Sequence, residues 1–112
     1  MASGSTRSKN GLALYKSMVS LNEANSQCMD CHSSQPPSHA STNNGVFICQ
    51  SCAEIHKLEL PEKASSVKSL TEEDLTSSEL QKMLASGNQR FHDFLKEYKL
   101  EHGVEIRLKY MT

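Results

Sequence analysis

Two closely spaced cysteine pairs constrain this chain more than any other feature of its sequence. Cys28 and Cys31 form the first pair, Cys49 and Cys52 form the second, and 17 residues lie between the pairs. Each two-residue gap lets one turn of backbone aim two sulfurs at a single ion, and the distance between the pairs is typical of tetrahedral four-thiolate zinc sites. Four sulfurs close the coordination shell to water and substrate. We therefore predict one structural Zn²⁺ whose binding contributes to the folding free energy.

Two disulfide bonds are the alternative use of four cysteines. Disulfides stabilise small secreted domains, but no apolar segment follows the polar N-terminus of this chain, so nothing signals secretion. Only 37% of the 112 residues are hydrophobic and Trp is absent, so the core is small and benefits from an added disulfide or structural metal. Zinc in a reducing compartment fits these observations better than disulfides do. We expect an intracellular, cytoplasmic protein.

Three histidines lie close in sequence to the cysteines and are alternative ligands for a catalytic zinc centre. They are His32, His39 and His56. Four cysteines already complete a zinc shell, and a histidine near such a shell is more often a surface group or a partner of the ligands. We therefore predict that the cysteines, and not the histidines, bind the metal.

The charge balance argues against a nucleic-acid partner. Twelve Lys and Arg against thirteen Asp and Glu give a formal net charge of −1, which lacks the positive excess of a phosphate-backbone binder. The longest apolar run, from Val46 to Cys49, is far too short to cross a bilayer, and the chain starts Met-Ala rather than with the Met-Gly of N-myristoylation. We expect no direct membrane insertion, so any membrane contact comes through a partner.

Residue patterns divide the chain into a short leader and one domain. Residues 1–9 are small and polar and are predicted to be a disordered leader, and residues 10–112 suit a single small domain. Apolar spacing, breakers and turn residues predict the elements of its first half. These are a helix from near Asn10 to near Asn22, a loop with little regular structure over 28–45, a strand over 46–48 and a helix over 50–59.

Helix signals are strongest in the second half of the chain. Thr76 and Glu79 fit the capping box, and Gly87 is placed to end the helix that they begin. Asn88 is placed to cap the next helix, which Gly103 should end. Its apolar residues recur at helical spacing and are predicted to be core rather than a binding stripe: Phe91, Phe94, Leu95 and Tyr98. Residues 104–110 alternate in the pattern of a half-buried strand.

Several short pieces of the sequence together match one known family. They are Cys28-x2-Cys31, Ala40-Ser41-Thr42-Asn43, Gly45-Val46-Phe47-Ile48-Cys49, Cys52, Ile55-His56, Ser66-Val67-Lys68-Ser69-Leu70 and Leu84-Ala85-Ser86-Gly87-Asn88. Spaced cysteines alone occur in many zinc modules, whereas their combination with Gly-Val-Phe-Ile-Cys and Gly-Asn is specific. The chain resembles the zinc-finger domain of the Arf GTPase-activating proteins from about residue 12 to the C-terminus.

The resemblance implies a small α/β (α+β) zinc-finger domain with a short, mainly antiparallel three-stranded sheet surrounded by helices. It implies binding to a GTP-loaded Arf-type GTPase and faster GTP hydrolysis by that partner, a regulatory role rather than an enzyme in its own right. It also implies helix from about Ile106, against the strand pattern there. The family domain extends by a further helix beyond Met111-Thr112, so we expect a shortened C-terminal helix.

The resemblance also identifies a candidate catalytic residue. In the family, an Arg five residues after the last cysteine is supplied in trans to the nucleotide, where its planar fork offsets charge on the transferred phosphoryl group. That position is Lys57 here. Lysine keeps the charge but loses the bidentate fork, so the exchange predicts weak or lost activation. A solvated surface lysine without a catalytic role is the other interpretation of Lys57.

Further departures from the family pattern point the same way. His39 replaces a Trp, Asn44 replaces a Leu, and residues 58–63 lack a Gly-Val-His stretch and add acidic side chains. These changes leave a catalytically silent, zinc-stabilised interaction module or an accessory structural subunit of a larger assembly as the alternative function. A protein scaffold is then the alternative partner to an Arf-type GTPase. A GATA-like DNA-binding finger is disfavoured, because the residues after Cys52 are not basic.

Overall fold

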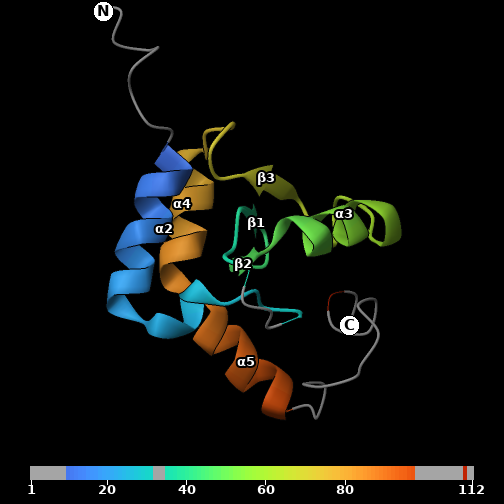
Figure 1. Cartoon of the computed structure of the whole chain (residues 1–112). Helices are drawn as coiled ribbons and strands as arrows, with labels where there is room; N and C mark the ends of the chain where they lie inside the picture. Colours follow the sequence, from blue (N-terminus) through green and yellow to red (C-terminus); the bar gives the residue numbers. More distant parts are fainter. Residues whose placement is uncertain (1–9, 32–34, 98–109, 111–112) are drawn as a thin grey trace, which may run out of the picture.

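The structure is a computed structural model that describes residues 10–31, 35–97 and 110, with helices packed around one small sheet (Figure 1). The elements in chain order are α-helix α2 (Asn10–Leu21), 3₁₀-helix η1 (Glu23–Ser26), strands β1 (His39–Ser41) and β2 (Val46–Ile48), helix α3 (Gln50–Glu59), strand β3 (Val67–Ser69) and helices α4 (Ser77–Ala85) and α5 (Asn88–Glu97). The predicted fold class, a small α/β domain with a three-stranded antiparallel sheet, is confirmed.

Strand β1 is the centre of the sheet, with β2 and β3 paired antiparallel on its two edges. Ala40 lies opposite Phe47 on one side and Lys68 on the other. This strand corrects the prediction of a loop with little regular structure over residues 28–45. Sequence patterns miss it because Ala40 and Ser41 are small and are both buried, so no alternation of apolar and polar residues marks the strand.

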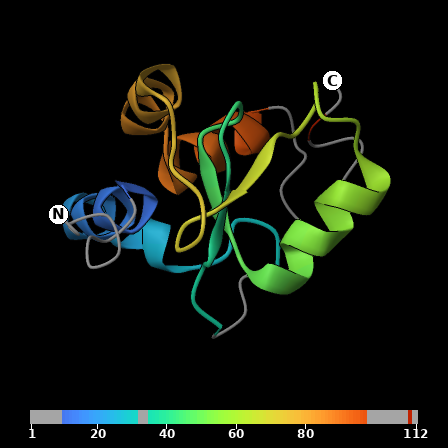
Figure 2. The ribbon, with the colours of Figure 1, turned by 90° about the horizontal axis from the view of Figure 1, so that it is seen from above.

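Strand β2 matches the predicted strand, and all three of its side chains are buried. Successive side chains of a strand point to opposite faces of the sheet. Val46 and Ile48 accordingly pack in a cluster with three of the cysteines, whereas Phe47 packs with residues of α2 and α4. Figures 1 and 2 show the corresponding layers, with α3 on one side of the strands and α2 and α4 on the other. A continuous apolar run is therefore needed to cover both faces.

The predicted helices α2, α3 and α4 are confirmed close to their expected ends. Helix α2 begins at Asn10, whose side chain donates a hydrogen bond to the Leu75 carbonyl (2.9 Å) and accepts one from the Leu75 N–H (2.8 Å). This pair of bonds fastens the start of α2 to the segment before α4. The capping box of α4 is complete: Glu79 N–H donates to Thr76 Oγ1 at 3.1 Å, and Thr76 N–H donates to Glu79 Oε1 at 2.8 Å.

Two glycines allow the β1–β2 turn to meet the junction between α4 and α5. Gly45 has a φ of 73° and Gly87 a φ of 104°, both in the left-handed region that favours glycine. The Gly87 N–H donates to the Gly45 carbonyl at 2.7 Å. A Cβ atom on Gly45 would lie 2.3 Å from Cβ of Ser86, so no larger residue fits at this contact without movement.

Asn88 has a different role from the helix cap predicted for it. Its Oδ1 accepts a hydrogen bond from the Phe47 N–H at 2.8 Å, and its Nδ2 donates to the Gln27 carbonyl at 2.7 Å. Its own N–H donates to Asn25 Oδ1 at 2.8 Å. The side chain therefore joins α5 to β2 and to the segment before the first cysteine pair, while Asn25 accepts the first N–H of α5.

The apolar stripe of α5 is only partly core. Leu95 is fully buried and Phe91 is half-buried, as predicted, but 44% of Phe94 is exposed, so the prediction was wrong for that residue. Helical spacing puts these side chains on one face without fixing how far that face is covered. The predictions for Tyr98 and Gly103 fall outside the described residues.

The predictions for the two ends of the chain are largely untested. The leader over residues 1–9 lies outside the described residues, as does the helix expected from Ile106, except at Tyr110, which is helical and buried. Within the part of the chain that the structure describes, no helix combines the length and apolar character needed to span a bilayer.

Candidate metal centre

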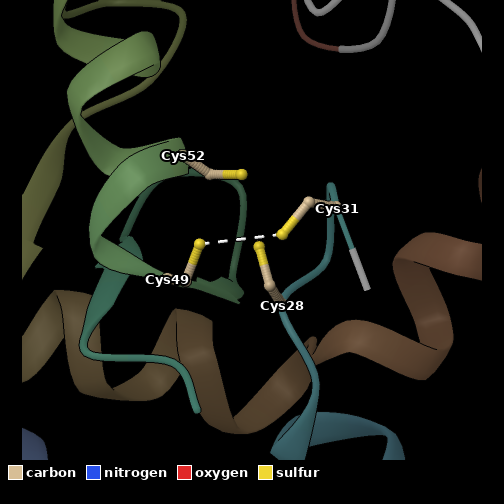
Figure 3. A group of neighbouring side chains, drawn as sticks. All are labelled: Cys28, Cys31, Cys49 and Cys52. Atoms are coloured by element: carbon tan, nitrogen blue, oxygen red, sulfur yellow. Dashed lines mark hydrogen bonds between the residues drawn. The ribbon is translucent and has the colours of Figure 1, made fainter. Parts of the chain in front are cut away.

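The four predicted cysteines come together at one point between the η1–β1 segment and the start of α3. Their four Sγ atoms all lie within 4.8 Å of one another, and they point toward a common centre in Figure 3. Sγ of Cys31 and Sγ of Cys49 are 3.7 Å apart. A tetrahedron with Zn–S bonds of about 2.3 Å has sulfurs about 3.8 Å apart. The spacing and the all-thiolate donor set therefore fit one zinc ion.

Local structure explains how each pair reaches this point. Cys49 is the N-cap of α3 and Cys52 lies in its first turn, so β2 leads directly into the second pair. The first pair follows η1, and the N–H of Met29 donates to the Phe47 carbonyl at 3.0 Å, which ties the first pair to β2. Cys28, Cys49 and Cys52 are buried, and Cys31 is exposed. None of these four described cysteines forms a disulfide.

The sulfurs are close enough to change one another's ionisation. The hydrogen bond with Cys52 lowers the pKa of Cys28 to about 4, and the same bond raises the pKa of Cys52. Burial raises the pKa of Cys49. The raised pKa values of Cys49 and Cys52 oppose their ionisation beside Cys28, since like charges in one buried cluster repel. A divalent cation at the centre would allow all four thiolates to form together.

The structure describes two of the three histidines considered as alternative ligands, and neither belongs to the cysteine cluster. His32 lies outside the described residues. His39 begins β1 and is half-buried, with Nδ1 2.7 Å from Oγ of Ser38. His56 is fully buried in α3, but its ring nitrogens contact Asp30 and Ser65 rather than the cluster centre. The contact with Asp30 is a feature that sequence reasoning missed. The sequence positions could have indicated this contact, since Asp30 lies within the first cysteine pair and His56 is one helical turn after Cys52.

Lys57 is exposed on α3 and lines a cleft of about 240 Å³. Leu60, Ser65 and Val67 contribute to this cleft, together with the acidic Glu62. His39 is close enough for the two residues to interact electrostatically. Burial lowers the pKa of His39, and the positive charge of Lys57 lowers it further. Two departures from the family pattern, at positions 39 and 57, therefore lie near enough for the charge of one to affect the other.

Asn44, a third departure, has a structural role. Its Nδ2 donates to Oγ of Ser41 and to the Ala64 carbonyl, each at 2.8 Å. Ser41 is buried in the central strand, and Ala64 lies in the segment between α3 and β3. Asn44 thus joins the β1–β2 turn to the segment that carries the added acidic residues.

Comparison with known proteins agrees with the fold and the metal centre. The family described as "Putative GTPase activating protein for Arf" matches residues 13–108. The chain is 33% identical over 87 residues to the ADP-ribosylation factor GTPase-activating protein GCS1 of Saccharomyces cerevisiae, covering 78% of this chain and 24% of that protein. It is 39% identical over 77 residues to stromal membrane-associated protein 1 of Homo sapiens, covering 69% of this chain and 16% of that protein. The chain spans about a quarter or less of the length of these relatives.

Comparison with a solved structure also supports the assignment to this family. The fold is similar to the crystal structure of a putative GTPase activating protein for ADP ribosylation factor from Cryptosporidium parvum, with a TM-score of 0.67 and 28% identity, covering 77% of this chain and 67% of that one. The zinc-binding cysteine pattern, the fold and these matches lead to one conclusion. The chain belongs to the Arf GTPase-activating protein family.

Proposed function

We propose that this domain binds a GTP-loaded Arf-type GTPase through the surface around Lys57, and that it accelerates GTP hydrolysis weakly or not at all. The observation that carries the proposal is the position of Lys57. It is exposed on α3, a helix that starts at the cysteine cluster, and it lines a cleft. A cationic side chain on a fixed helix suits contact with a phosphate-bearing partner.

The weakness of catalysis follows from the chemistry of lysine. An ammonium group is a point charge, whereas guanidinium offers two parallel N–H donors to the oxygens of a phosphoryl group. An arginine finger accelerates hydrolysis by roughly 10³ to 10⁵. Even partial loss of that contribution leaves little activity. The carboxylate of Glu62 on the same cleft adds a negative charge that opposes approach of a nucleotide.

A catalytically silent interaction module is the second candidate, favoured by the apolar side chains beside Lys57. Ile55 is 45% exposed and Leu58 is 83% exposed on α3. Large apolar side chains exposed next to one another suit contact with a protein partner, either an Arf-type GTPase or a scaffold. In both candidates the ligands Cys28, Cys31, Cys49 and Cys52 hold one zinc, and the reduced thiolates favour the cytoplasm.

Single-turnover GTP hydrolysis tests the proposal, with Arf-type GTPases as the panel and binding measured alongside. We expect the unmodified domain and Lys57→Ala to give similar, low rates. Lys57→Arg should raise the rate at least tenfold without a matching change in affinity, because the restored contact forms in the transition state.

The outcomes separate the two candidates. Binding with no acceleration by Lys57→Arg would favour the silent module. Robust hydrolysis with the unmodified protein, lost in Lys57→Ala, would contradict the proposed weakness and make Lys57 an effective finger.

A further inference from the structure

We propose that Asp30 and His56 form a side-chain bridge that holds the two cysteine pairs in the spacing that zinc requires. His56 is then a positioning residue of the metal site. This inference concerns the metal centre and is independent of the proposed action on a GTPase.

The bridge joins the two halves of the site directly. Asp30 lies between Cys28 and Cys31, and His56 lies on α3, one turn after Cys52. Nε2 of His56 is 2.6 Å from Oδ2 of Asp30. No side chain of the bridge needs to contact the metal for this connection to matter. It links the loop that supplies two sulfurs to the helix that supplies the other two.

The ring of His56 has little freedom to move. It is 0% exposed, and its second nitrogen, Nδ1, is 2.6 Å from Oγ of Ser65. The edge of its ring also contacts the ring of Tyr110, with centroids 4.6 Å apart. A ring hydrogen-bonded at both nitrogens and packed on one side has one orientation. Its Nε2–H therefore points at Asp30 in a fixed direction.

Asp30 is equally constrained, since both of its carboxylate oxygens accept hydrogen bonds. Oδ2 accepts from His56, and Oδ1 accepts from the Tyr110 hydroxyl at 2.7 Å. The bond from Tyr110 satisfies the carboxylate but does not connect the two cysteine pairs. The bond from His56 does both. These two bonds to one carboxylate therefore provide a matched comparison.

Loss of the bridge should weaken the hold on zinc. The Cys28–Cys31 loop would keep its backbone bond from Met29 to β2 but would lose the Asp30–His56 connection to α3. Zinc binding would then have to order that loop. Groups that orient metal ligands typically change metal affinity by about 10- to 100-fold when they are removed. We expect the rate of zinc release to rise by a factor of the same order.

The test is the rate at which the zinc-loaded protein transfers zinc to an excess of a chromogenic chelator. The bridge variants are Asp30→Ala, His56→Phe and the double variant; the controls are Tyr110→Phe and Gln89→Ala, which changes an exposed residue of α5. We expect each bridge variant to release zinc at least tenfold faster, and the double variant to be no faster than the quicker single variant. The controls should stay within about threefold of the unmodified protein.

Stability must be followed in the same five variants, by urea unfolding in excess zinc. Equal acceleration in the controls, additive effects of the two bridge changes, or release rates that follow the free energy of unfolding across all variants would each overturn the proposal. If His56→Phe does not fold, Asp30→Asn replaces it, since it keeps the shape of the side chain and removes the charge. Unchanged release from Asp30→Asn and Asp30→Ala would then refute the bridge.

Discussion

Replacing the buried Asn88 by Ala should destabilise the domain more than replacing any one exposed polar side chain by Ala. Asn88 is 1% exposed. Its removal leaves the buried Phe47 N–H without its acceptor, which costs about 1–3 kcal/mol. The bond to the Gln27 carbonyl is also lost, and a bond of this kind contributes about 0.5–1.5 kcal/mol. The Phe47 carbonyl keeps its bond from Met29. The sum is a loss of about 1.5–4.5 kcal/mol, against a total of about 5–15 kcal/mol for a small domain.

Urea unfolding in excess zinc, followed by circular dichroism, measures this loss. With a slope of about 1.5 kcal/mol per molar urea, a loss of 3 kcal/mol lowers the midpoint by about 2 M. Gln89→Ala is the matched control, because Gln89 is the next residue of α5 and its side chain is exposed. That change should cost under about 0.5 kcal/mol. A loss below about 1 kcal/mol for Asn88→Ala would refute the role given to Asn88.

Two further changes test contacts of the β1–β2 turn and of helix α4. Gly45→Ala should cost more than about 2 kcal/mol in urea unfolding, because it combines a positive φ with a clash against Ser86, and adding Ser86→Gly should recover part of the loss. A Gly45→Ala variant as stable as the unmodified protein would contradict this. Glu79→Gln should cost about 1 kcal/mol at pH 7. Burial acts to raise the pKa of Glu79, but its bonds to Lys68 and to the backbone of Thr76 give a net lowering. Its contribution is therefore present above the unfolded value of about 4.5 and is lost as the pH falls through the folded value. With the metal site kept filled by excess zinc, a difference between the two proteins that does not shrink as the pH falls below about 4.5 would contradict this reasoning.

The sequence predicted those parts of the structure that are governed by local chemistry. The cysteine spacing indicated the metal centre because two short gaps allow little other geometry. The capping box at Thr76 and Glu79 indicated the start of α4 because both of its hydrogen bonds form within one turn. Strand β2 stood out as a continuous apolar run, and the helix after it was bounded by Cys49 and Pro61.

Features that depend on distant contacts were less predictable. Strand β1 is made of small residues, and only its two neighbours and the helices over both faces explain why Ala40 is buried. Asn88 looked like a helix cap, and its bond to Phe47 spans 41 positions in the chain. His56 and Asp30 are 26 positions apart. No periodicity in the sequence encodes such pairings, because they arise when elements pack.

Helix α3 connects the metal centre to the surface around Lys57. Helix α3 begins at Cys49, carries the buried His56, and exposes Lys57 immediately after it. A change at the exposed Lys57 need not disturb the metal site or the buried residues of α3. For this reason we expect exchange of Lys57 to alter the rate of GTP hydrolysis by a bound partner and to leave the fold unchanged.

The central claim is that one zinc ion held by four thiolates maintains this fold. Removal of the metal with a strong chelator, followed by far-ultraviolet circular dichroism, tests it most directly. We predict cooperative loss of helical signal as zinc leaves and recovery when zinc is restored, since metal binding by small domains contributes on the order of 10 kcal/mol. An unchanged spectrum from protein shown to contain no metal would contradict the claim.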